Sequence, residues 1–115
     1  MTYIFLLYGD ETNASVDPEA MEAYMVPWFE YDQMLKDKGH YVGGEALQPT
    51  ATATTVTALS GTPVWTDGPF AETREQLGGF YIVRCKDLDE AMELAARCPG
   101  AREGRVEVRP ILDLS

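Results

Sequence analysis

An aspartate in a rigid turn is the residue of this chain whose setting most favours chemistry. The segment Val64–Phe70 reads VWTDGPF, so a short strand runs into Asp67-Gly68-Pro69 and an aromatic residue follows at once. Gly68 can take a positive φ, and Pro69 fixes its own φ and disfavours the helical region for Gly68. If a pocket desolvates the Asp67 carboxylate, it can act as a general base. Alternatively, the carboxylate accepts backbone N–H bonds around Gly68 in an Asx-turn.

Other charged residues offer further candidates for a binding site. Glu72 and Glu75 are three residues apart in a segment, 71–77, that favours a short helix, so they would face the same side. Such a pair can bind a cation or share acid and base roles, or it can form a solvated acidic face. Arg109 can hold an anionic ligand or pair with a carboxylate such as Glu107 or Glu72. His40 either contributes to a site or stabilises the end of the preceding helix.

Aromatic residues could line a pocket between helix and sheet, or they could be core residues. They are Tyr8, Trp28, Phe70 and Tyr81. No metal site and no cofactor is predicted, because the sequence has no His/Cys cluster with metal-ligand spacing. It also lacks a Gly-x-Ser-x-Gly elbow and a glycine loop with the spacing that cradles phosphate.

Composition narrows the classes of partner. Nine basic and nineteen acidic residues give a net charge of −10, which repels phosphate backbones and anionic lipid, so neither nucleic acid nor a membrane is an expected partner. The charge serves solubility or steers a cationic ligand. Cys85 and Cys98 read as free thiols in a reducing compartment, and we expect a cytoplasmic protein.

The chain must fold into elements that position these residues. We expect strands at residues 3–8, 40–47, 80–85 and 106–111, a hairpin from 54–59 and 63–66, and helices after Asp17 and Asp87. Their order predicts one α+β domain over residues 1–115. It fits a ferredoxin-like βαβ-βαβ antiparallel sheet with two helices on one face and an inserted β-hairpin.

The predicted central strands are apolar on both faces. Two helices cover only one face of a sheet, so the other face of Tyr3–Tyr8 and Phe80–Cys85 needs a cover as well. A homodimer formed sheet to sheet is the simplest solution.

Several motifs together resemble one known family. VWTDGPFAETREQLGGFYIV, EALQPT at Glu45–Thr50 and VEVRP at Val106–Pro110 resemble the YCII-related family, and more narrowly its branch with the Asp-Gly-Pro-Phe (DGPF) motif. The resemblance covers nearly the whole chain. It implies a ferredoxin-like fold assembled as a dimeric α/β barrel, similar in architecture to muconolactone isomerases.

The resemblance leaves several functions open. Some YCII-like members pair a histidine on the first helix with the aspartate that Asp67 matches, but here that helix carries Pro27 and Trp28 near the expected position and no histidine. One hypothesis is an acid–base enzyme that acts on a small organic molecule through Asp67. The alternative is a non-catalytic ligand-binding or regulatory module linked to an extracytoplasmic-function sigma factor, since members of this branch are often encoded beside such factors. A third is a structural domain whose motif serves folding alone.

Overall fold

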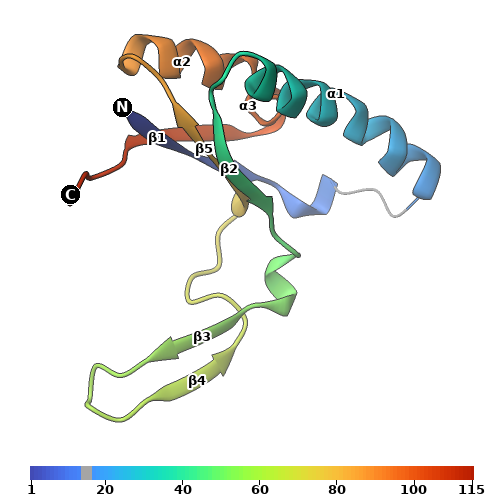
Figure 1. The fold of residues 1–115 in the computed structure, drawn as a ribbon. Coiled ribbons are helices and arrows are strands. Elements are labelled where there is room, and N and C mark those ends of the chain that lie inside the picture. The colour runs from blue at the N-terminus through green and yellow to red at the C-terminus, as the bar shows by residue number, and fades with distance from the viewer. Residues whose placement is uncertain (14–16) are drawn as a thin grey trace.

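The computed structural model describes residues 1–13 and 17–115 (Figure 1). Its strands are β1 (Thr2–Gly9), β2 (Tyr41–Ala46), β3 (Thr54–Thr57), β4 (Val64–Asp67), β5 (Gln76–Arg84) and β6 (Arg105–Pro110). Its helices are α1 (Pro18–Asp37), α2 (Leu88–Arg97) and α3 (Gly100–Glu103), with short 3-10 turns at Glu11–Asn13 and Thr50–Thr52.

Four strands form one antiparallel sheet in the order β2-β5-β1-β6. With two long helices on the same side of this sheet (Figure 1), the mixed α+β architecture is consistent with the ferredoxin-like prediction. The apolar strands β1 and β5 are the two central ones, as their sequences indicate. β6 lies at an edge, where Pro110 removes no interior hydrogen bond.

Alternation along the central strands separates the two faces of the sheet. Tyr3 and Phe5 on β1 are buried in the core beneath the helices, whereas Ile4 and Leu6 are only partly buried and belong to the opposite face. On β5, Tyr81 and Val83 face the helices, and Phe80 and Ile82 share the opposite face with Ile4 and Leu6. We call this second face, comprising Ile4, Leu6, Phe80 and Ile82, the outer face.

Both long helices begin where the sequence indicates. The Asp17 side chain accepts the Glu19 N–H (3.2 Å) and Pro18 is the first residue of α1, which continues through Pro27. The Asp87 side chain accepts the Glu90 N–H (2.9 Å) at the start of α2. No helix in the described ranges 1–13 and 17–115 is both long and apolar enough to cross a membrane.

The hydrophobic core lies between the helices and the sheet. Its buried members are Tyr3, Phe5, Tyr31, Leu35, Tyr81, Val83, Cys85, Ala91, Leu94, Ala95 and Cys98. The Tyr31 hydroxyl donates to the Leu94 carbonyl oxygen (2.8 Å). That carbonyl is in the last turn of α2, where intrahelical donors run out, so this bond ties α1 to α2. Cys85 and Cys98 are free and buried, as predicted.

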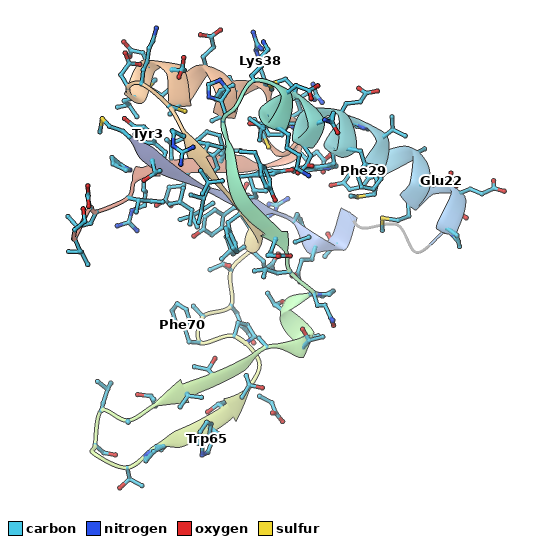
Figure 2. All side chains as sticks on the ribbon, in the orientation of Figure 1. Tyr3, Glu22, Phe29, Lys38, Trp65 and Phe70 are labelled. Atoms are coloured by element: carbon cyan, nitrogen blue, oxygen red, sulfur yellow. The ribbon has the colours of Figure 1, made fainter. Side chains whose placement is uncertain are left out.

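Strands β3 and β4 pair with each other as a separate two-stranded sheet. We call residues 47–71 the arm; it projects away from the helices and the main sheet (Figure 1). Large apolar side chains on the arm are exposed, including Trp65 (69%) and Phe70 (91%) (Figure 2). A hairpin of this kind is only marginally stable without something to pack against.

The predicted short helix at residues 71–77 is wrong. Residues 71–75 are irregular and β5 already begins at Gln76. Here the Thr73 hydroxyl donates to the Glu75 carbonyl oxygen (2.6 Å), a local bond that competes with helical pairing. The structure also contains α3, which the pattern Pro99-Gly100 did not indicate.

Candidate functional site

Asp67 ends β4 and is exposed to solvent. Gly68 has φ 97°, the left-handed conformation that its sequence context predicts. The turn is fixed by the backbone, because the Gly68 N–H donates to the Ala53 carbonyl (2.7 Å) and the Thr55 hydroxyl donates to the Gly68 carbonyl (2.7 Å). Within the described part of the chain the Asp67 carboxylate accepts no Asx-turn bond, and Asp67 lines neither of the two cavities described below.

The other charged candidates lie far apart rather than in one site. Glu72 is exposed, and Glu75 approaches Arg105 (3.4 Å, Nε to Oε2). Since residues 71–75 form no helix, the expected shared face of Glu72 and Glu75 is not formed. Arg109 lies 3.9 Å from Glu107, two residues away on β6, so the ion-pair alternative for Arg109 is the one observed.

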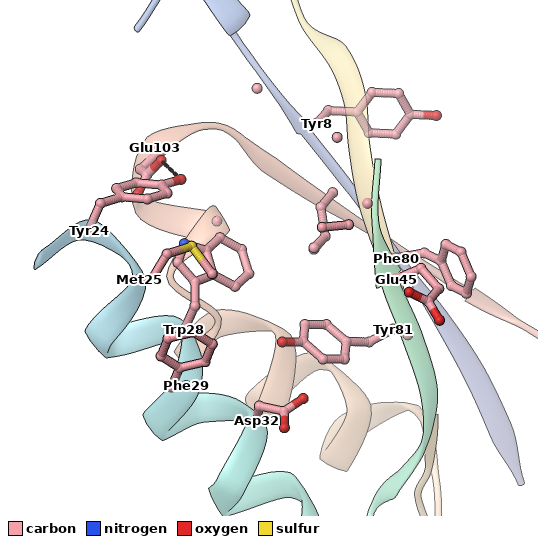
Figure 3. A pocket seen from close by; sticks show the side chains of 17 residues that line it. Tyr8, Tyr24, Met25, Trp28, Phe29, Asp32, Glu45, Phe80, Tyr81 and Glu103 are labelled. Atoms are coloured by element: carbon pink, nitrogen blue, oxygen red, sulfur yellow. Dashed lines mark hydrogen bonds between the residues drawn. The ribbon is translucent and has the colours of Figure 1, made fainter. Parts of the chain in front are cut away.

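A cavity of about 460 Å³ lies between α1 and the sheet (Figure 3). Three of the four predicted aromatic residues line it: Trp28 and Tyr81 point into the cavity, whereas the Tyr8 ring points away from it (Figure 3). Phe70 lies on the arm and is not part of the lining. Its other lining residues are Leu7, Gly9, Tyr24, Met25, Phe29, Asp32, Gly44, Glu45, Ala46, Gly78, Gly79, Phe80, Gly100 and Glu103. The volume is typical of a pocket for a small organic ligand.

Small residues on the sheet create this space. Gly44 and Ala46 occupy helix-facing positions of β2, and Gly79 is opposite Ala46 on β5, so little side-chain volume rises toward α1. Gly100 has a complementary role, because a Cβ there would lie 3.1 Å from Cη2 of Trp28. Glycine at this position therefore lets the Trp28 indole pack closely against the start of α3.

The Tyr81 hydroxyl is the polar group most directly available to a ligand. Tyr81 is 9% exposed, and its ring packs edge-on against Tyr31 with centroids 5.6 Å apart. Its hydroxyl points from the sheet into the cavity (Figure 3) and has no hydrogen-bond partner among the described residues. Burial, and secondarily the charge of Asp32, raises the pKa of Tyr81, so it remains a neutral hydroxyl that can donate and accept.

Two carboxylates stand at the ends of the cavity, and a third turns away from it (Figure 3). Asp32 on α1 approaches the Lys36 ammonium group (2.8 Å, Nζ to Oδ2). Glu103 on α3 accepts a hydrogen bond from the Tyr24 hydroxyl (2.8 Å); burial and then this bond raise the pKa of Tyr24. Glu45 is paired with Phe80, so its side chain belongs to the outer face.

A second hollow is polar and its charges are already paired. Tyr8, Asp10, Thr73, Arg74, Glu75, Glu103 and Arg105 line it. Arg74 lies 3.8 Å from Asp10, and Arg105 lies 3.4 Å from Glu75. This hollow therefore resembles a surface network of ion pairs more than a ligand site.

His40, Cys85 and Glu90 form a donor cluster that the sequence did not reveal. One ligand atom from each lies within 4.8 Å of the other two. Two of these residues already bind backbone groups, since His40 Nδ1 donates to the Arg84 carbonyl (2.8 Å) and Glu90 Oε1 accepts the Lys86 N–H (3.0 Å). Burial and then Glu90 raise the pKa of Cys85, which favours the thiol over the metal-binding thiolate. The cluster is therefore accounted for by its structural role at the start of α2.

The polar residues of the α1 cavity are not evident from the sequence motifs. Tyr24, Trp28 and Asp32 are spaced by four along α1, so they share a helical face. That spacing was the available signal for Asp32. No sequence pattern indicated Glu103, because helix α3, which carries it, was not predicted.

Comparison with known proteins agrees with the motifs and the fold. The YCII-related domain matches residues 1–115. An uncharacterised protein of Rhizobium meliloti (strain 1021) is 37% identical over 114 residues, covering 96% of this chain and 92% of that protein. The chain therefore belongs to the YCII-related family.

Proposed function

We propose that this protein binds a small organic molecule in the cavity between α1 and the sheet. The observation that carries the proposal is the hydroxyl of Tyr81, a residue whose ring is packed in the core; the hydroxyl points into the cavity and has no partner among the described residues. Every buried side-chain nitrogen or oxygen among the described residues has a hydrogen-bond partner, so the cavity leaves this hydroxyl open to solvent and therefore to a ligand. The aromatic side chains of the lining, such as Trp28 and Phe29, supply the apolar contact that small-molecule sites use.

Ligand binding is better supported than catalysis. The acid–base alternative depends on Asp67, which is exposed on the arm and absent from the lining of the cavity. Within this proposal Asp67 acts on a bound molecule only if the arm of a second copy brings it there. The DGPF motif at Asp67–Phe70 supports placement in the DGPF-motif branch, and with it the alternative of a regulatory module linked to a sigma factor.

A homodimer is part of the same proposal. The outer face carries Ile4, Leu6, Phe80 and Ile82, and a second copy would cover it as in a dimeric α/β barrel. The arm adds a second argument, because Asp67 is the one charged residue among residues 47–71 in a chain of net charge −10. Depletion of charge is typical of the centre of an interface, and this nearly neutral arm can approach an acidic copy without strong repulsion.

The cavity proposal is tested by blocking the cavity. Ala46 faces the helices, so Ala46→Trp fills the space, whereas Ala20→Trp places the same side chain on an exposed turn of α1. A library of small organic molecules is screened by thermal shift against the native protein. We expect stabilising compounds to act on native protein and Ala20→Trp but not on Ala46→Trp. Stabilisation that survives Ala46→Trp would place the ligand elsewhere.

The dimer proposal is tested by sedimentation equilibrium at micromolar concentration. We expect a dimer for the native protein and a folded monomer for Ile82→Glu, which puts a charge on the outer face. A native monomer at this concentration would contradict the proposal.

A further inference from the structure

We infer that the α1 cavity selects an organic cation, with a protonated amine or a quaternary ammonium group attached to a flat or compact apolar body. This inference rests on the proposed ligand-binding function and adds the chemical class of the ligand. It follows from three properties of the lining residues: their aromatic rings, their charges and the vacant Tyr81 hydroxyl.

Aromatic faces are the first property. Trp28 and Tyr81 lie on opposite sides of the space, and Tyr24 and Phe29 flank it along α1 (Figure 3). The negative faces of such rings attract ammonium groups, and tryptophan attracts them most strongly. The attraction grows when water is excluded, and the buried Tyr81 ring provides such an environment.

Charge is the second property. Asp32 and Glu103 are at the two ends of the cavity, and no lysine, arginine or histidine is among its described lining residues. At the Asp32 end the neighbouring cation is Lys36, whose side chain is 48% exposed and lies 2.8 Å from one oxygen of Asp32. Near the Glu103 end, Arg74 and Arg105 line the adjoining hollow and approach Asp10 and Glu75. Lys36 lies outside the lining, so it competes for Asp32 from the solvent side.

The vacant hydroxyl is the third property. Tyr81 can accept a hydrogen bond from a protonated amine, while its ring contacts the apolar body of the ligand. A carboxylate or phosphate ligand finds the opposite conditions, since it would approach two carboxylates with no basic side chain in the lining to pair with it. The net charge of −10 also raises the local concentration of cations and lowers that of anions.

Three phenols that differ in one substituent test the inference by isothermal titration calorimetry. The cation is 3-hydroxyphenyl-trimethylammonium, its uncharged isostere is 3-tert-butylphenol, and the anion is 3-hydroxybenzoate. We expect the cation to bind native protein about tenfold more tightly than its isostere. We expect the anion to show no saturable binding.

Variants that remove one charge test whether the cavity residues cause the preference for the cation. Asp32→Asn and Glu103→Gln should each weaken binding of the cation about three- to tenfold and leave the uncharged isostere unchanged. Lys36→Met should strengthen binding of the cation, because it frees the Asp32 carboxylate. Raising the salt concentration should weaken binding of the cation alone. Urea unfolding of each variant verifies that it is folded.

The outcomes separate the two proposals. Equal or tighter binding of 3-tert-butylphenol, abolished by Ala46→Trp, would refute cation selection and leave the ligand-binding function standing. Binding of the cation that is insensitive to both carboxylate variants would also refute cation selection. Absence of saturable binding for all three probes would count against both.

Discussion

Two core tyrosines on facing elements, Tyr31 and Tyr81, test whether a hydroxyl serves the fold or is left free for a ligand. Tyr31 and Tyr81 are in edge-to-face contact, with both rings in the core. The Tyr31 hydroxyl donates to the Leu94 carbonyl, whereas the Tyr81 hydroxyl finds no partner among described residues. Replacing each by phenylalanine removes one oxygen and preserves the ring. Only Tyr31→Phe should then destabilise the fold.

The expected loss of stability follows from the hydrogen bond that each substitution removes. Tyr31→Phe leaves the Leu94 carbonyl without its donor in a buried setting, since Leu94 is 5% exposed. Leaving a buried acceptor unsatisfied costs about 1–3 kcal/mol. For a chain of 115 residues, each kcal/mol lowers Tm by about 4 °C. Tyr81→Phe breaks no protein hydrogen bond, so its effect on the free energy of unfolding should be within about 0.5 kcal/mol.

The assay is urea unfolding of native protein, Tyr31→Phe and Tyr81→Phe, followed by circular dichroism and repeated by differential scanning calorimetry. We expect a clear loss of stability for Tyr31→Phe alone. Tyr81→Phe should instead weaken binding of ligands in the α1 cavity. If Tyr81→Phe destabilises the protein as much as Tyr31→Phe, its hydroxyl serves the fold, and the argument for a vacant polar group fails.

Three further predictions concern stability. Asp87→Ala should cost about 1 kcal/mol because it removes the cap of α2, whereas Asp89→Ala, next to that cap, should be nearly neutral; urea unfolding compares them. Gly68→Ala should cost about 1 kcal/mol or more because φ is 97° there, and an unchanged Tm would contradict the assigned turn. Burial raises the pKa of Cys98 from 9.0 to about 11. The folded state therefore holds this proton more tightly, and the stability it contributes is full below pH 9 and is lost as pH rises to 11. Between pH 8 and pH 10.5 this loss should be about 2 kcal/mol, and the fall in stability measured by urea unfolding should be smaller in Cys98→Ala.

Much of the fold was predictable because local signals agreed with tertiary structure. Asp17 and Asp87 begin helices by capping backbone N–H groups, which short sequence patterns reveal. The doubly apolar strands became the central strands β1 and β5. Segment 71–77 misled the analysis, because β5 pairs Gln76 and Leu77 with β1 and this long-range pairing overrides a weak helical preference.

The candidate site was predictable only in part. Trp28, Tyr8 and Tyr81 were named as pocket residues, and the fold brings them together. Phe70 was named with them as an aromatic residue, and Asp67 as a carboxylate that a pocket could desolvate, but both lie on the arm and neither lines the cavity. Where a hairpin extends relative to a sheet depends on packing that a sequence pattern does not encode.

The central claim is that the α1 cavity is the ligand site. Its most direct test measures chemical-shift changes of the backbone amides and tryptophan indole N–H groups by nuclear magnetic resonance during titration with 3-hydroxyphenyl-trimethylammonium. The account predicts that the largest changes occur at the Trp28 indole N–H and at Gly44, Gly79 and Gly100, which surround the α1 cavity. Changes concentrated instead around Trp65 and Asp67 on the arm would contradict it and return the site to the DGPF turn.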